Sequence, residues 1–244
     1  MMSRTISWFS CGAASACASK LALRDYDNVI IARCIVDNEH EDNSRFADDI
    51  SDWLDADIVN LRSDKYVDCW DVWEKTRWLN GPQGARCTVE MKKKVRQRFS
   101  EIDDIHIIGF TYEEEHRAIK FNKENPEIAT AYPLIDNKIS KSMCFDIIRD
   151  VGIELPAMYR LGYYNANCIG CVKGGAGYWN KIRVDFRDDF YRMADLEKDI
   201  GASCINGRPL ATLPPAAGRH KDLYLPDCGL FCGENEGWGK HEPH

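Results

Sequence analysis

The sequence predicts an α/β protein with a doubly wound, mainly parallel sheet of five strands and a cysteine-rich C-terminal appendage. Over the first 139 residues, short apolar stretches typical of strands alternate with amphipathic stretches typical of helices, as in βα units. From about residue 140 the chain becomes dense in glycine, aromatic residues and cysteine. We therefore expect an α/β domain over residues 1–139 and a helical, cysteine-rich region over residues 140–244 that packs on it.

Five stretches carry the residue pattern of strands. Residues 28–36 are apolar almost throughout, as expected of a central parallel strand that is covered on both faces. A weaker strand is expected over residues 130–134, at an edge of the sheet, because its proline has no N–H to donate to a neighbouring strand. The other three strands are expected over residues 6–9, 58–61 and 104–110.

Apolar residues recur at helical spacing between these strands. Asn43 or Ser44 is expected to cap a helix that ends near Leu54. An Ala- and Leu-rich stretch over residues 16–23 also predicts a helix. Further helices are expected over residues 88–99 and 113–121, around residues 143–148, and within residues 178–198.

Composition excludes some classes of protein. Charged residues make up 29% of the chain and no apolar run approaches about 20 residues, so no membrane span is expected. The net charge of −7 argues against broad electrostatic binding to nucleic acid, although residues 92–98 form a local basic run. Eleven cysteines without a clear secretion signal indicate a reducing compartment, so we expect a cytoplasmic protein.

The turn after the first strand has the form Ser10-x-Gly12-x-x-Ser15. Backbone N–H groups at such a turn, with the two serine hydroxyls, are suited to a phosphate, although an ordinary closely packed turn has the same composition. Neither a Walker loop nor a G-x-G-x-x-G pattern is present. Since ligands bind at the carboxyl ends of parallel strands, residues 10–15, 37–40 and 109–115 are expected around one crevice.

Residues 7–15 resemble the pyrophosphate loop of the adenine nucleotide alpha hydrolase (PP-loop) superfamily. The resemblance is to the phosphoadenosine phosphosulfate reductase-like branch, whose loop has the form S-x-G-x-x-S. ATP pyrophosphatases usually carry S-G-G-x-D-S, and this chain has Cys11 and Ala14 in place of the first Gly and the Asp. Four further segments resemble the family in the same order, over residues 84–92, 109–117, 132–135 and 167–171.

The resemblance implies that the first domain binds an adenine nucleotide, either phosphoadenosine phosphosulfate or ATP. Asp37 would then lie near the adenosine, and Lys92 would bind phosphate or sulfate together with two candidate catalytic residues, Arg86 and Arg117. On physical grounds each of these side chains could equally be a solvated helix residue. The remaining nucleotide-binding candidates are the loop residues Ser10, Cys11, Gly12 and Ser15, with Gly109 after the fourth strand.

Two activities fit this resemblance. In the first, which we prefer because the loop lacks the pyrophosphatase Asp, a thiol takes the sulfonate of the nucleotide and sulfite is released. This activity needs a thiol reductant such as thioredoxin as a partner. In the second, an ATP-dependent sulfurtransferase inserts sulfur into a nucleic acid. A non-catalytic nucleotide-binding subunit is a third interpretation, and a homodimer is compatible with all three.

The cysteines form a second group of candidates. Cys168-x-x-Cys171 and Cys228-x-x-x-Cys232 could supply four thiolates to structural zinc or to an iron–sulfur cluster, with Cys87 as an alternative ligand. In iron–sulfur members of the family, adjacent cysteines and a C-x-x-C hold the cluster. Here Cys87 is followed by a threonine, so a tail cysteine, Cys228 or Cys232, would have to complete the site.

Cys228 also has a competing role. Residues 227–231 resemble the reductase tail motif E-C-G-L-H, in which the cysteine attacks the sulfonate sulfur. The histidine and the glutamate of that motif are replaced by Phe231 and Asp227. Cys228 is therefore a candidate catalytic nucleophile and a candidate ligand, and one thiolate does not easily serve both roles.

The histidines and tryptophans are expected to have mainly structural roles. His106 alternates with apolar residues in a strand, which favours a buried structural side chain, whereas His40 could reach the crevice. The tryptophans at positions 53, 70, 73, 78 and 179 are expected to be core or interface anchors.

Overall fold

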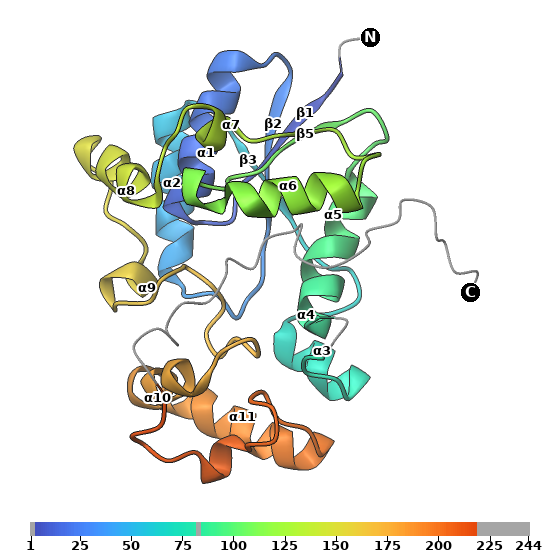
Figure 1. The fold of residues 1–244 in the computed structure, drawn as a ribbon, viewed down its shortest axis with the longest axis vertical. Coiled ribbons are helices and arrows are strands. Elements are labelled where there is room, and N and C mark those ends of the chain that lie inside the picture. Colours follow the sequence, from blue (N-terminus) through green and yellow to red (C-terminus); the bar gives the residue numbers. More distant parts are fainter. Residues whose placement is uncertain (1–2, 82–83, 219–244) are drawn as a thin grey trace.

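The computed structural model describes residues 3–81 and 84–218, and within them the chain is an α/β protein with five strands, all parallel (Figure 1). The strand order is β3-β2-β1-β4-β5. The predicted α/β class with a parallel five-stranded sheet, and the positions of its five strands, are thus confirmed. The strands are β1 (Thr5–Trp8), β2 (Val29–Cys34), β3 (Ile58–Leu61), β4 (Ile105–Ile107) and β5 (Thr130–Ala131).

The order of the strands indicates the position at which a ligand crevice is expected. β1 pairs with β2 on one side and with β4 on the other, so that Thr5 lies opposite both Val29 and Ile105. The chain therefore winds outward from β1 to β2 and β3, and then returns to the other side of β1 to add β4 and β5. This reversal is a topological switch point, and the carboxyl end of β1 is where a ligand crevice is expected.

Helices cover both faces of the sheet and build a third layer at one end (Figure 1). The main helices of the first half are α1 (Ala13–Asp25), α2 (Asp42–Leu54), α3 (Cys69–Thr76), α4 (Arg86–Thr88), α5 (Lys94–Phe99) and α6 (Glu115–Glu124). Those of the second half are α7 (Pro133–Asp136), α8 (Lys141–Asp150), α9 (Ala157–Arg160), α10 (Ala176–Asp185) and α11 (Arg187–Ile200).

Two hydrophobic clusters lie on the two faces of the sheet. On one face Ile31 and Ile107 pack against α1, α2 and α8. On the other face Trp8 and Ala32 pack against residues of α5 and α6 such as Val95. Because successive residues of a strand point to opposite faces, the nearly unbroken apolar sequence of β2 serves both clusters.

The third cluster surrounds α3, α10 and α11. It buries Trp70, Trp73 and Trp179, as expected for core tryptophans, whereas Trp78 is 44% exposed. The cluster contains residues from both sides of position 140. In Figure 1, α10 and α11 lie at the end of the molecule toward which β1 runs, with α3 beside them.

Some element boundaries differ from those expected. α2 begins at Asp42, so neither Asn43 nor Ser44 caps it. The expected helix over 88–99 consists of α4, a π-helical turn (η1, Val89–Lys93) and α5. The expected helix within 178–198 is two helices, because Phe186 has non-helical backbone angles between α10 and α11. β5 stops before Pro133, whose fixed φ suits the first position of α7.

His106 has the structural role that its position in a strand predicts. It is 1% exposed, and its Nδ1 accepts a hydrogen bond of 3.0 Å from the indole N–H of Trp8. Burial, with a smaller contribution from the charge of Arg96, lowers the pKa of His106 to about 4. None of the helices within residues 3–81 and 84–218 is long and apolar enough to cross a membrane.

Candidate functional site

The loop between β1 and α1 is closed by its own serines. The Ser15 hydroxyl donates to the carbonyl oxygen of Gly12 at 2.9 Å and accepts from the backbone N–H of Ser10 at 3.1 Å. The Ser10 hydroxyl also donates to the Ser15 hydroxyl, at 3.2 Å. Cys11 takes a left-handed conformation with a φ of 56°, which non-glycine residues adopt only at a cost. The two serine hydroxyls therefore hold the turn rather than pointing separately to a ligand.

The N-terminus of α1 carries the features of an anion site. Gly12 is the N-cap and offers no side chain to the N–H groups of the first turn, which has no acidic residue. These N–H groups and the helix dipole favour a negative charge at this end. A Cβ added to Gly12 would lie 3.1 Å from the hydroxyl oxygen of Tyr159, so α9 closely approaches the loop.

Gly109, which follows β4, packs directly against this loop. A Cβ at this position would lie 2.9 Å from the Cα of Ser15 and 3.1 Å from its N. Both are backbone atoms, which cannot move aside as a flexible side chain can. The structure thus gives Gly109 a steric reason for being glycine, since its missing side chain lets α1 sit close to the end of β4.

A network of buried charges lies beside the loop. The Glu39 carboxylate contacts the Arg33 guanidinium at 3.3 Å, the Lys92 ammonium at 3.4 Å and the side-chain amide of Asn43 at 3.2 Å. The side chains of Arg33, Glu39 and Lys92 are each less than 10% exposed. Burial raises the pKa of the Cys11 thiol well above its usual value, and this thiol feels the charges of the same three residues.

Two cations, Arg33 and Lys92, contact the same carboxylate, and the fully buried Arg96 is on the same helical segment as Lys92. Buried cations next to a helix N-terminus are a suitable environment for an anion. Lys92 lies close enough to the loop for its charge to act on the Cys11 thiol. Arg33 and Glu39 were not singled out from the sequence, since Arg33 looks like one residue of an apolar strand.

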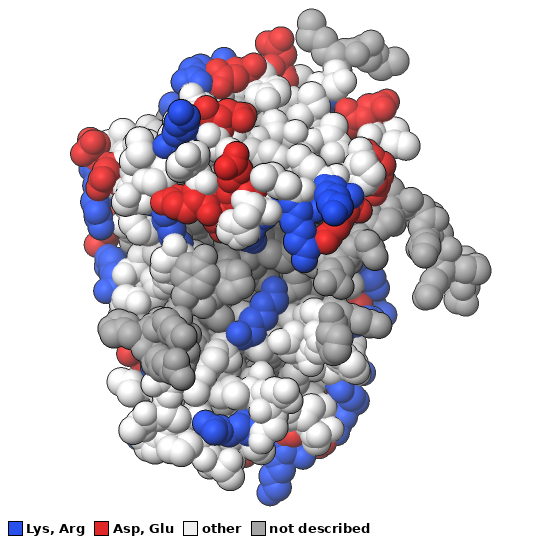
Figure 2. Space-filling model, viewed as in Figure 1, with Lys and Arg blue, Asp and Glu red and all other residues white. Residues whose placement is uncertain are grey.

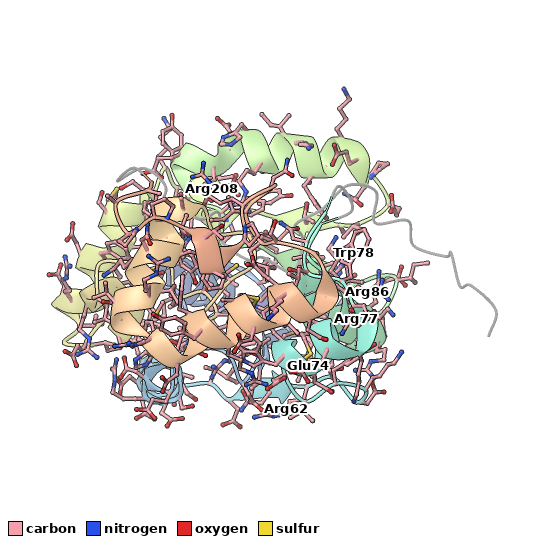
Figure 3. All side chains as sticks on the ribbon, turned by 90° about the horizontal axis from the view of Figure 1, so that it is seen from below. Arg62, Glu74, Arg77, Trp78, Arg86 and Arg208 are labelled. Atoms are coloured by element: carbon pink, nitrogen blue, oxygen red, sulfur yellow. The ribbon has the colours of Figure 1, made fainter. Side chains whose placement is uncertain are left out.

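The two candidate catalytic arginines are held by local carboxylates. Arg86 pairs with Glu90 at 2.7 Å, and its Nε is buried without a partner. Figure 3 shows Arg86 on the same side of the molecule as Arg77 and Trp78. Arg117 of α6 pairs with Glu114 and lies 4.3 Å from the ring centroid of Phe110, the residue after Gly109.

Asp37 borders a small cavity at the carboxyl ends of β2 and β3. Its carboxylate pairs with Arg62 at 2.7 Å. The cavity has a volume of about 260 Å³. Most of its lining is polar or charged, including Ser63, Asp64 and Lys65, and the apolar part includes Ile35 and Met91.

Five cysteines lie in one neighbourhood. The thiol of Cys69 lies close to those of Cys87 and Cys168, and Cys204 is near Cys171 and Cys87. The neighbouring thiol of Cys69 and the ammonium of Lys173 lower the pKa of Cys87, against the effect of burial. Cys168, Cys171 and Cys87 were candidates from the sequence, whereas Cys69 and Cys204 were missed because only the fold brings them close.

The Cys168-x-x-Cys171 turn, called the knuckle below, is held by a tyrosine. The Tyr178 hydroxyl accepts from the backbone N–H of Cys171 at 2.9 Å and donates to the carbonyl oxygen of Cys168 at 3.1 Å. Gly170 has a φ of 70°, which the tight turn between the two cysteines requires. The backbone between the two cysteines is thus fixed from inside the protein.

In the part of the chain that the structure describes, however, no three His, Cys, Asp or Glu side chains already stand in the arrangement of a metal site. The nine cysteines of this part are free thiols. The other two predicted ligands, Cys228 and Cys232, lie outside the described residues, so the nucleophile role of Cys228 has no structural description either.

On the face shown in Figure 2, Lys and Arg side chains of the described residues are interspersed with Asp and Glu.

No family model matches this chain, and no curated protein matches it. Its class therefore follows from its own geometry: an α/β protein in which an uncapped helix N-terminus and buried cations meet at the switch point of a parallel sheet.

Proposed function

We propose that this protein binds an adenine nucleotide with its anionic end at the Ser10–Ser15 loop and carries out thiol-dependent sulfonucleotide reduction. The observation that carries the proposal is the pair of buried cations, Arg33 and Lys92, that meet at the carboxylate of Glu39 beside the N-terminus of α1, which has no side-chain cap. Buried cations and the N–H groups of a helix N-terminus both attract the anionic end of a nucleotide.

The adenosine end of the nucleotide would lie toward Asp37. The cavity beside Asp37 adjoins Met91, and the next residue, Lys92, reaches the charge network. A nucleotide could thus extend from the cavity beside Asp37 to the loop along the carboxyl ends of β2 and β1. The resemblance of the loop to phosphoadenosine phosphosulfate reductases supports the same direction.

In the proposed reaction a cysteine thiolate attacks the sulfur of phosphoadenosine phosphosulfate. The S–O bond to the phosphate breaks, adenosine bisphosphate leaves with the electron pair, and the cysteine keeps the sulfonate. A second thiol, from a reductant such as thioredoxin, then attacks the cysteine sulfur, which forms a disulfide and releases sulfite. The loop N–H groups and Lys92 would stabilise the negative charge that develops on the leaving phosphate.

Two buried cysteines near the loop do not suit the role of nucleophile. Burial raises the pKa of Cys11 well above its usual value and that of Cys34 to about 12, so neither forms a thiolate at neutral pH. Cys228, in its reductase-like tail motif, is therefore the proposed nucleophile.

The test combines binding with turnover. Calorimetry with phosphoadenosine phosphosulfate, ATP and adenosine should show that the two nucleotides bind and that adenosine binds much more weakly. Sulfite should form when phosphoadenosine phosphosulfate is supplied with thioredoxin or dithiothreitol. Lys92→Met should weaken nucleotide binding at least tenfold, whereas Lys120→Met, which removes an exposed lysine of α6, should leave the affinity unchanged.

Three outcomes would contradict the proposal. If adenosine binds as tightly as the two nucleotides, the loop does not bind their anionic end. Release of pyrophosphate from ATP, without sulfite from phosphoadenosine phosphosulfate, would make the protein an ATP-dependent sulfurtransferase instead. Tight nucleotide binding with neither product would make it a non-catalytic nucleotide-binding subunit.

A further inference from the structure

Four separate segments of the chain bring cysteines to one place between the sheet and α10. Cys69 is the first residue of α3, and Cys87 is the middle residue of α4. Cys168 and Cys171 lie on the knuckle before α10, and Cys204 follows α11. All five belong to, or pack against, the cluster of α3, α10 and α11.

Asn38, in the loop after β2, hydrogen-bonds to two of these segments and so fixes them relative to each other. Asn38, four residues after β2, is 8% exposed. Its side-chain oxygen accepts from the backbone N–H of Cys69 at 2.6 Å, and its carbonyl oxygen accepts from the backbone N–H of Ile169 at 2.8 Å. The neighbourhood of Cys69 and Cys168 is thus built by buried hydrogen bonds, in addition to the contact between their thiols.

We propose that Cys69 is the fourth ligand of a thiolate-coordinated metal group, zinc or an iron–sulfur cluster, held by Cys69, Cys87, Cys168 and Cys171. Four thiolates are the usual ligand set of both kinds of group. Cys69 takes the place that an adjacent pair of cysteines would fill, since Thr88 follows Cys87. The inference goes beyond the proposed function and does not depend on it, because metal content is measurable without turnover.

The four thiols must rearrange to bind such a group, since the described residues hold no finished metal site. Coupling of metal binding to a local rearrangement is common in thiolate sites, because thiols without metal have no reason to point at one centre.

Cys204 is nearby but is already engaged. The carboxylate of Glu197, which is 2% exposed, accepts from the backbone N–H of Cys204 at 2.6 Å and from the Cys204 thiol. It also accepts from the N–H of Leu210 at 2.6 Å, which holds the loop after α11 in place. Cys204 is therefore a matched control: a cysteine in the same neighbourhood that does not bind the group.

The remaining described cysteines, at positions 11, 17, 34 and 144, belong to the clusters on the two faces of the sheet. The proposed set is complete without Cys228 and Cys232. It therefore leaves Cys228 available as a nucleophile and removes the conflict between its two candidate roles.

The experiment measures metal in the full chain after anaerobic purification, with iron, acid-labile sulfide and zinc determined per monomer and the visible spectrum recorded. The wild type should carry either about one zinc or a brown iron–sulfur cluster, and the iron, sulfide and zinc values distinguish the two. Cys69→Ser should lose at least nine-tenths of the metal after a chelator challenge. Cys204→Ser and the double variant Cys228→Ser/Cys232→Ser should keep wild-type metal content and spectrum.

Several results would overturn the inference: a wild type that stays metal-free after reconstitution with zinc or with iron and sulfide, full metal retention by Cys69→Ser, or loss of metal from Cys204→Ser. If Cys69→Ser does not fold, the tail double variant decides. If the double variant Cys228→Ser/Cys232→Ser loses its metal, the tail cysteines are ligands and the inference is wrong. If it keeps its metal, the ligands come from the cysteines that the structure describes, as inferred. A failure of sulfite release would affect none of these measurements.

Discussion

Replacing Gly109 with alanine tests whether the contact between β4 and the loop determines nucleotide binding. The new Cβ would lie 2.9 Å from the Cα of Ser15, about half an ångström closer than ordinary contact begins. The Cα of Ser15 is a backbone atom and the new Cβ is fixed to the backbone of residue 109, so neither can turn aside. The N-terminus of α1 must therefore shift. Overpacking of this kind costs about 1–3 kcal/mol of the free energy of unfolding. At a typical urea dependence this lowers the unfolding midpoint by about 0.5–1 M.

The same shift should weaken nucleotide binding. A hydrogen bond to a charged group contributes about 1.5–3 kcal/mol, so misplacing one N–H donor of the first turn should raise the dissociation constant about tenfold or more. Calorimetry with phosphoadenosine phosphosulfate or ATP gives this constant, and urea unfolding followed by circular dichroism gives the stability.

A matched control separates the two effects. Gly152, after α8, has a φ of 80° and open space around its added Cβ, so Gly152→Ala should cost about 1 kcal/mol of stability without changing affinity. If Gly109→Ala lowers stability but binds nucleotide as the wild type does, the loop is not the phosphate site. If it changes neither quantity, the close approach of β4 and α1 is not a real constraint.

Three further predictions concern buried charges. Glu39→Gln removes the carboxylate that contacts both Arg33 and Lys92, so the free energy of unfolding should fall by about 3 kcal/mol. Nucleotide should then raise the melting temperature more than in the wild type, and an equal rise would contradict this prediction. His106 is neutral in the folded protein and its pKa of about 4 lies below the unfolded value, so the unfolded chain binds the proton first as the pH falls. Between pH 6.5 and pH 4 the free energy of unfolding of the wild type should therefore fall by about 3 kcal/mol more than that of His106→Asn. Urea unfolding at each pH measures this, and the same pH dependence in both proteins would contradict it. Asp42→Asn should cost about 1–3 kcal/mol, since this carboxylate joins α2 to α9 by accepting from Arg45 at 2.7 Å and from the N–H of Ala157 at 2.7 Å; an unchanged melting temperature would count against it.

The fold was predictable because each strand has its own local pattern. Residues 28–36 are apolar on both faces, as β2 is buried on both faces, and Pro133 indicated that β5 lies at an edge. The helix boundaries were less predictable. The break at Phe186 and the π-helical turn at residues 89–93 depend on packing against other elements, and they leave no periodicity signal in the sequence.

The candidate site was predictable only where it is continuous in sequence. The loop from Ser10 to Ser15 has a recognisable pattern, and Lys92 became a candidate through the family resemblance of residues 84–92. Cys69 and Glu39 gave no such signal, because a lone cysteine and a lone glutamate acquire their meaning from residues far away in the chain. Arg33 was hidden for a different reason: a charged residue in an apolar strand is notable only once its burial is known.

The two candidate sites share one helical segment. The segment from Arg86 to Phe99, which includes the π-helical turn, carries Cys87 in its first turn and Lys92 near its middle. Asn38 makes a second connection, since it directly follows Asp37 and binds the backbone of both Cys69 and Ile169. A ligand of the proposed thiolate group and the lysine that the proposed function places on the nucleotide phosphate are thus five residues apart on the same segment.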